Sequence, residues 1–84
     1  MLDWRNNGSF KGQMYREAEF TIDILAGRRF KNGLTAKETE QMNRAKNLKE
    51  DVVEWYDMNP EDANEVFERW LKMREVNKEI GIEA

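Results

Sequence analysis

Residues 59–62 read Asn-Pro-Glu-Asp (NPED), and this stretch decides the predicted fold. Asparagine is a preferred N-cap residue, proline is favoured at the first helical position, and acidic residues stabilise the first turn of a helix. The stretch therefore predicts that a helix starts at Pro60. Because the connection at 58–60 is too short for anything but a reversal of direction, the helices on either side are expected to form an antiparallel hairpin.

The helix after the reversal is predicted over 60–80, with Gly81 at its end. Its inward positions alternate steps of three and four residues, which is the heptad spacing of a helix packed on a neighbour. They are Ala63, Val66, Trp70, Met73, Asn77 and Ile80. Asn77 is the single polar residue of this seam. It either fixes the register or oligomeric state, as a lone asparagine does in coiled coils, or lies at a fraying helix end in contact with water.

The helix before the reversal is predicted over 36–58. Thr35 is a good N-cap residue, and Glu38 three positions later completes a capping box. Beyond this start, one apolar stripe steps by three or four residues along the helix, through Met42, Ala45, Leu48, Val52 and Trp55.

Residues 13–26 also show helical spacing of apolar positions, and Gly27 stands where a helix C-terminal glycine belongs. Residues 20–24 alternate in polarity and are rich in strand formers, so periodicity alone does not decide between helix and strand. A helix is favoured because a single short strand would have no partner. Residues 1–12 lack helical periodicity and are predicted to form an irregular N-terminal arm. Its large apolar side chains, Trp4 and Phe10, are expected to dock either on the bundle of the same chain or on a neighbouring chain.

The predicted fold is therefore all-α: a long antiparallel helical hairpin plus an N-terminal helix, forming one small helical bundle over 13–84. Eighty-four residues bury a small fraction of their surface, so a partner chain would add stability. Apolar residues flank the inward stripes of both hairpin helices, and we expect a homo-oligomer that covers them. The predicted interface residues are Trp55, Val66, Phe67, Trp70, Met73 and Asn77.

The composition excludes several classes of site. The chain contains no cysteine and no histidine, which removes disulfides, thiolate nucleophiles, imidazole bases and nearly every zinc site. We expect no catalysis, no cofactor and no metal. No stretch approaches the length of a membrane span and no secretory signal is evident, so a cytoplasmic protein is expected. The net charge of −3 argues against binding to duplex nucleic acid.

Acidic residues gather around the predicted hairpin bend, between Glu50 and Glu68. This cluster could imitate nucleic-acid phosphates or hold a hard cation through carboxylate oxygens. A solvated face with favourable dipole placement is the preferred interpretation, because the spacing does not show that the carboxylates converge. Trp55, Tyr56 and Trp70 could likewise form a ligand-facing aromatic wall, although aromatics at this spacing are more often core or interface.

The best local candidate for an anion site is the stretch 27–35. A phosphate placed before Thr35 would meet the unpaired backbone N–H groups of a helix start. The predicted ligand-binding residues are Tyr15 or Phe30 for stacking on a base, and Arg28, Arg29, Lys31, Gly33 and Thr35 around the phosphate. The alternative is an ordinary connector whose basic residues neutralise the C-terminal end of the preceding helix.

At this stretch the chain resembles a family of small phage proteins, the anti-CBASS nucleotide sponges, whose helical hairpin is shared with anti-Thoeris sponges. The resemblance covers residues 30–80: an Arg/Lys-containing segment leads into Leu34-Thr35-x-x-Glu38, followed by Asn43 and Lys46 and then a second long helix. It implies a homo-oligomer that binds cyclic di- or trinucleotides in pockets between protomers and performs no chemistry. Tyr15, Lys31, Gly33 and Thr35 are the nearest residues here of the types that such pockets use.

Two functions follow as hypotheses. The first is a non-catalytic, phage-type anti-defence sponge that sequesters cyclic nucleotides. The second is a phage-type inhibitor or adaptor that binds a host protein through its acidic hairpin or its surplus apolar helix face.

Overall fold

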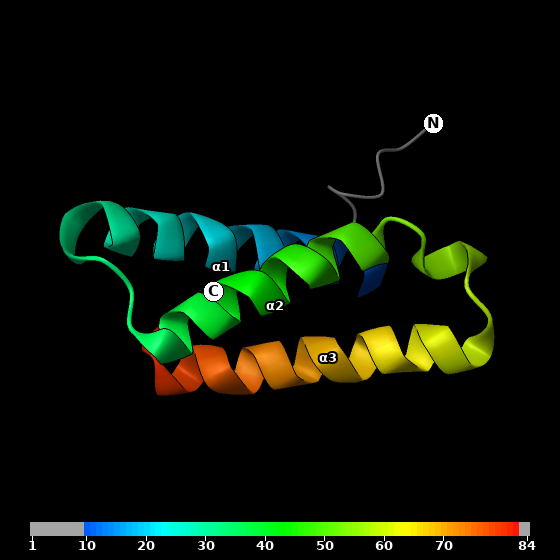
Figure 1. Cartoon of the computed structure of the whole chain (residues 1–84). Coiled ribbons are helices and arrows are strands. Elements are labelled where there is room, and N and C mark those ends of the chain that lie inside the picture. The colour runs from blue at the N-terminus through cyan, green and yellow to red at the C-terminus, as the bar shows by residue number, and fades with distance from the viewer. Residues whose placement is uncertain (1–9, 83–84) are drawn as a thin grey trace.

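The structure is a computed structural model that describes residues 10–82, and it is all-helical over that range (Figure 1). It comprises α1 (Phe10–Asn32), α2 (Ala36–Val52), a short 3₁₀ helix η2 (Trp55–Asp57) and α3 (Pro60–Glu79). No strand occurs in these residues, which confirms the predicted all-α class. None of the helices within 10–82 is long and apolar enough to cross a membrane.

Each long helix runs opposite to the one before it, so the three form an up-down-up bundle (Figure 1). α2 packs more extensively on α1 than on α3. The N-terminal helix is thus a full member of the bundle, rather than an addition to a hairpin of α2 and α3.

Both helix starts predicted from capping residues are present. The Thr35 hydroxyl accepts a hydrogen bond from the Glu38 backbone N–H at 3.1 Å, and the Glu38 carboxylate accepts one from the Thr35 N–H at 3.0 Å. At α3, the Asn59 side chain accepts from the Asp62 N–H at 2.9 Å, with Pro60 in the first turn. These local contacts satisfy backbone donors that have no partner within the helix.

α1 is longer at both ends than predicted. It starts at Phe10, so residues 10–12 of the predicted irregular arm are helical, and Trp4 lies outside the described residues. Gly27 was expected to end the helix but lies within it. Gly33 ends it instead, with a φ of 78° that suits the glycine after a helix C-terminus. Residues 20–24 are helical, because the residues at helical spacing on this face are buried against the other helices: Met14, Ala18, Thr21 and Leu25.

α2 is shorter than predicted and ends at Val52, although the apolar stripe continues to Trp55 and Met58. The chain turns there, and the Trp55 indole N–H donates to the Ala63 carbonyl of α3 at 2.8 Å. A side chain that the periodicity assigned to the helix stripe therefore ties the connection η2 to α3.

The predicted interface residues are mostly in the core of the protomer itself. Val66, Trp70 and Met73 are no more than 2% exposed and pack with residues of α1 and α2, while Trp55 and Phe67 are half-buried against the same cluster. Because α1 covers this seam between α2 and α3, the seam is not presented to a second chain. The structure corrects the prediction in this respect.

Asn77 takes part in a buried polar network that joins all three helices. Its Nδ2 donates to the Thr21 hydroxyl of α1 at 2.8 Å, and its Oδ1 accepts from Gln41 Nε2 of α2 at 2.7 Å. Gln41 Nε2 also donates to the Met73 carbonyl at 2.8 Å, and Thr21 donates to the Glu17 carbonyl. Asn77 is only 7% exposed, so the alternative of a water-exposed amide at a fraying end is wrong.

Candidate functional site

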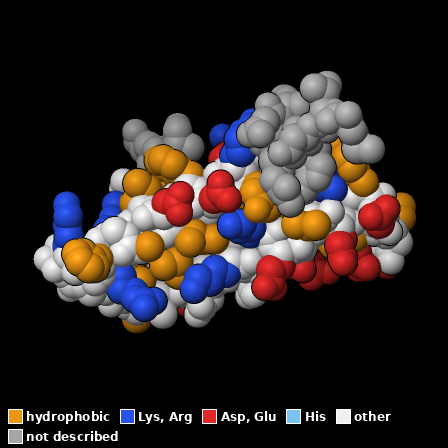
Figure 2. Space-filling view, turned by 90° about the horizontal axis from the view of Figure 1, so that it is seen from above, with side chains coloured by type: hydrophobic (Ala, Val, Ile, Leu, Met, Phe, Trp, Pro, Cys, Tyr) orange, Lys and Arg blue, Asp and Glu red, His pale blue; other side chains and the backbone are white. Residues whose placement is uncertain are grey.

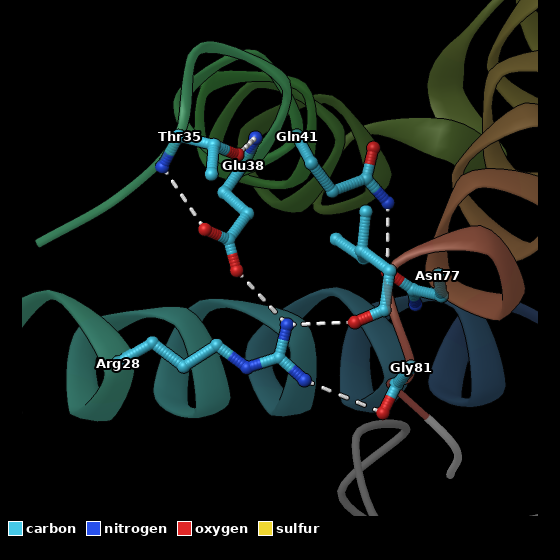
Figure 3. Close-up of polar contacts among 7 residues, drawn as sticks. Arg28, Thr35, Glu38, Gln41, Asn77 and Gly81 are labelled. Carbon is cyan, nitrogen blue, oxygen red and sulfur yellow. Dashed lines mark hydrogen bonds and ion pairs between the residues drawn. The ribbon is translucent and has the colours of Figure 1, made fainter. Parts of the chain in front are cut away.

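The predicted anion-binding stretch 27–35 is mostly helix, and its first basic residue has a structural partner set. Arg28 Nη1 donates to the Ile80 carbonyl at 2.7 Å and to the Glu38 carboxylate at 3.0 Å, and Nη2 donates to the Gly81 carbonyl at 3.3 Å (Figure 3). One guanidinium thus joins the end of α1, the start of α2 and the end of α3. In this conformation Arg28 is a clamp on the fold, and its donors point at protein acceptors.

Thr35 is likewise used within the fold, because its hydroxyl and N–H form the capping box with Glu38. The hydrogen bond from the Thr35 backbone, together with the Arg28 guanidinium, lowers the pKa of the Glu38 carboxyl below its ordinary value. The carboxylate of Glu38 occupies the position before α2 where a bound phosphate was expected. A negative ligand at this helix start would therefore meet a negative side chain.

Arg29, Phe30 and Lys31 lie exposed in the last turns of α1, and Phe30 is 94% exposed. Neither Arg29 nor Lys31 forms an ion pair with any residue of 10–82. Gly33 follows them in the exposed connection to α2. These residues stay together as a basic and aromatic end of the bundle.

Tyr15 is separated from that end. It lies on the same helix thirteen residues before Arg28, which corresponds to about 20 Å along the axis. Of the two stacking residues predicted for the pocket, Phe30 therefore lies beside the basic residues, whereas Tyr15 is not brought together with them within a single protomer.

Tyr15 instead lines an open groove of about 420 Å³ between α1 and α2. The residues that line it are Tyr15 and Ile22 from α1, Lys46, Lys49 and Glu50 from α2, and Val53 just beyond α2. Tyr15 and Ile22 are two turns apart, and the α2 positions are spaced three, one and three residues, so each set lies on one helix face. The groove has an apolar floor and a charged rim, and its volume falls in the range of small-ligand pockets.

The Lys49 ammonium lies over the Tyr15 ring, 5.3 Å from its centroid, and 3.2 Å from the Glu19 carboxylate. The hydrogen bond with Glu19 raises the pKa of Lys49, so this lysine stays charged beside the ring. Lys46, one turn earlier on α2, is exposed and forms no ion pair within residues 10–82. The groove therefore combines an aromatic face, apolar contacts and one cation, Lys46, that has no counter-ion in the described part of the chain.

This arrangement can hold a flat aromatic group with an attached anion. An aromatic group packs against Tyr15 and the aliphatic residues, and an anion lies at Lys46, which is a compact point charge suited to phosphate. Reasoning from the sequence picked out Tyr15 as a ligand residue and Lys46 through the resemblance, but it missed Lys49 and Glu19. The spacing of Lys46, Lys49 and Val53 on one helix face is the signal that could have pointed to the groove.

A second hollow, between α1 and α3, suits an anion less well. It has a volume of about 490 Å³ and is lined by Gln13, Arg16, Glu17, Phe20 and Arg74. Arg74 Nε lies 3.2 Å from Glu17 Oε1, and its guanidinium stacks 5.0 Å from the Trp70 ring centroid. The arginine is thus already paired with a carboxylate. Nowhere in residues 10–82 do three acidic, histidine or cysteine side chains group to hold a metal ion.

Comparisons of the chain with protein-family models, with curated proteins and with solved structures find no match. The resemblance to nucleotide sponges therefore stays a prediction, and functional reasoning depends on the groove and on the two ends of the bundle.

Proposed function

We propose that this chain is a non-catalytic binding protein that sequesters a nucleotide, with the base in the groove between α1 and α2. The observation that carries the proposal is the Lys49 ammonium over the Tyr15 ring in an apolar-floored groove that also displays Lys46. Cyclic nucleotides are the preferred ligand class, as expected of a phage-type anti-defence sponge.

The charges around the groove favour a ligand with few negative charges. Lys46 and Lys49 contribute two positive charges, and Glu19 and Glu50 contribute two negative ones, so the four side chains sum to zero. A phosphodiester carries one negative charge per phosphate, whereas a nucleoside triphosphate would bring several to a site whose four side chains sum to zero. Cyclic nucleotides are therefore expected to bind more tightly than triphosphates.

Calorimetry and thermal shift against cyclic mono-, di- and trinucleotides, linear monophosphates and triphosphates test the proposal. Tyr15→Ala is expected to weaken binding by about 1–3 kcal/mol through loss of base stacking, whereas Tyr15→Phe keeps the ring and most of the affinity. Lys46→Ala is expected to remove the contact with phosphate. A ligand that binds only the folded state also raises the melting temperature, and that rise is expected to shrink in the same variants.

Two matched controls locate the site. Lys72→Ala removes an exposed lysine from α3 and is expected to leave binding unchanged. Lys31→Ala tests the end of α1. If it abolishes binding while Lys46→Ala does not, the ligand lies at the predicted stretch 27–35 and the groove proposal is wrong. If no nucleotide of the panel gives a heat of binding or a rise in melting temperature, the proposal of nucleotide binding is wrong altogether.

A second candidate function is a protein-interaction inhibitor or adaptor. It is favoured by the seven acidic residues and absence of basic ones in 50–65, together with exposed Tyr56 and Leu71. Co-purification of a host protein that is released by Glu54→Lys or Asp57→Lys would support it. Binding unaffected by these reversals would count against the acidic end as the contact.

A further inference from the structure

The end of the bundle where α1 leads into α2 combines an exposed aromatic ring with positive charge. Residues 27–37 carry four basic residues and no acidic one. Arg28 is paired with Glu38 and Lys37 with Glu79, while Arg29 and Lys31 flank Phe30 without ion pairs in the described range. Phe30 is 94% exposed in the last turn of α1, so a large apolar side chain projects into water. Covering such a ring with a partner removes apolar surface from water and so favours association.

The opposite end, where α2 leads into α3, has the complementary character. Residues 50–65 carry seven acidic residues and no basic one, and Figure 2 shows acidic side chains gathered there. Val53 and Tyr56 in the same segment are 42% and 61% exposed. Among residues 10–82, Arg69 and Lys11 from other segments face this end: Arg69 pairs with Asp51, and the Lys11 ammonium lies 4.8 Å from the Tyr56 ring centroid. The acidic residues still exceed these cations.

The two ends cannot meet within one protomer, because the seventeen residues of α2 hold them about 25 Å apart. We propose that copies of this chain associate head to tail, with Phe30, Arg29 and Lys31 of one copy docked on Val53, Tyr56 and the acidic residues of the next. The occupant is a second copy because both surfaces belong to the same chain, are opposite in charge and carry exposed apolar side chains. Such a heterologous contact leaves one end of each copy free and can extend beyond a dimer.

This docking also bears on the groove, in a way that rests on the proposed function. Glu50 and Val53 line the groove and belong to the acidic end. A copy docked there adds its basic end beside the groove and so brings residues predicted for one pocket, Tyr15 and Lys31, together across two protomers. Association without a nucleotide tests the docking alone, and nucleotide binding by an association-deficient variant tests the groove alone.

The experiment is sedimentation velocity of the full chain over a range of protein concentrations, at low and at high salt, without added ligand. The average mass is expected to rise with concentration at low salt and to fall towards the protomer at high salt, because the contact is between solvent-exposed charges. Phe30→Ser is expected to weaken association about tenfold or more, corresponding to the loss of one buried aromatic ring.

Charge reversal at one end or the other distinguishes head-to-tail docking from a symmetric dimer. A basic-end variant, Arg29→Glu with Lys31→Glu, and an acidic-end variant, Glu54→Lys with Asp57→Lys, are each expected to be monomeric alone. When they are mixed, one intact basic end meets one intact acidic end, so a dimer forms and nothing larger. Lys72→Glu makes the same kind of charge change away from both ends and is expected to associate like the parent chain.

Circular dichroism confirms that each variant is folded before its mass is interpreted. A parent chain that stays monomeric at every concentration would overturn the proposal. So would end variants that associate alone as the parent does, or a mixture of folded variants in which no dimer forms.

Discussion

Where α2 leads into α3, aromatic rings join the aliphatic residues of the core, whereas from the middle of the bundle to the opposite end buried hydrogen bonds accompany a second apolar cluster of Leu25, Met42 and Ile82. At the aromatic end the Trp70 ring lies 5.4 Å from that of Phe67 and 6.3 Å from that of Phe10, and Trp55 packs against the same cluster. At the polar end Asn77 and Arg28 join helices through hydrogen bonds.

The difference separates two tasks that a small bundle has to perform. Apolar burial supplies most of the free energy of folding but tolerates small shifts of one helix past another. A buried hydrogen bond contributes less, yet it is lost when the helices shift by even one residue. We infer that the two apolar clusters, and the aromatic one most of all, supply stability, and that the buried polar contacts fix the register.

The largest expected effect is at the aromatic end. Trp70→Ala removes a side chain that is 2% exposed and is expected to lower the free energy of unfolding by about 3–5 kcal/mol, measured by urea denaturation. Leu71→Ala, at a neighbouring position that is 45% exposed, is the control and is expected to change it by about 1 kcal/mol or less. Equal losses from the two variants would contradict the assignment of stability to this cluster.

The next effect is at the polar network. Asn77→Ala removes one of the two partners of Gln41 Nε2 and one of the two partners of the Thr21 hydroxyl, and is expected to lower the free energy of unfolding by about 1–3 kcal/mol. In a double-mutant cycle with Gln41→Ala, the coupling energy is expected to be about 0.5–3 kcal/mol. Asn43→Ala, on the exposed face of α2, is the matched control. Strict additivity of Asn77→Ala and Gln41→Ala would argue against a network.

A smaller effect is expected at the Arg28 clamp. Arg28→Gln loses charged hydrogen bonds to the Ile80 and Gly81 carbonyls and is expected to lower the free energy of unfolding by about 1–2 kcal/mol. Hydrogen exchange at the Ile82 N–H, which donates to the Asn77 carbonyl at 2.7 Å, is expected to accelerate as the end of α3 loosens. Arg29→Gln, at the exposed next position, should leave both quantities unchanged. If the two variants behave alike, Arg28 is not a clamp.

The smallest effect concerns pH. The Thr35 backbone and the Arg28 guanidinium hold the pKa of Glu38 below its ordinary value of 4.5, so its contribution to stability is complete above that value. This contribution is lost as the pH falls through the lowered pKa, because protonation removes the charge that both partners favour. The difference in unfolding free energy between the parent chain and Glu38→Gln is therefore expected to be constant above 4.5 and to shrink in more acidic solution. Glu40→Gln controls for the loss of one exposed carboxylate.

The helix starts were predictable from the sequence because capping is local. Thr35 with Glu38, and Asn59 with Asp62, make contacts over three residues, and the structure has both helix starts as expected. The C-terminal ends of the helices were harder to predict. Gly27 and Gly33 are both plausible C-terminal glycines, and a glycine inside a helix costs only about 1 kcal/mol, so composition does not distinguish them. Only the backbone conformation does, with Gly33 at φ 78°.

The candidate site was predictable only in its residue types. Tyr15 was singled out as a residue that could stack on a base, but its neighbours in the groove, Lys46 and Lys49, lie more than thirty positions later in the chain. Arg28 was assigned to an anion because its true acceptors, the carbonyls of Ile80 and Gly81, are more than fifty residues away. Contacts at such separations are set by how the three helices pack and leave no local pattern.

The amide of Asn77 has its oxygen bonded to α2 and its nitrogen bonded to α1, so neither neighbouring helix alone satisfies it. In a fragment lacking α1, the Asn77 amide loses its hydrogen bond to Thr21. The apolar seam that α1 covers becomes exposed to water in the same fragment. The hairpin of α2 and α3 is consequently not expected to persist as an independent piece after proteolytic cleavage between α1 and α2. Mixing the two severed fragments should restore helicity, since each supplies the acceptor or donor that the other lacks.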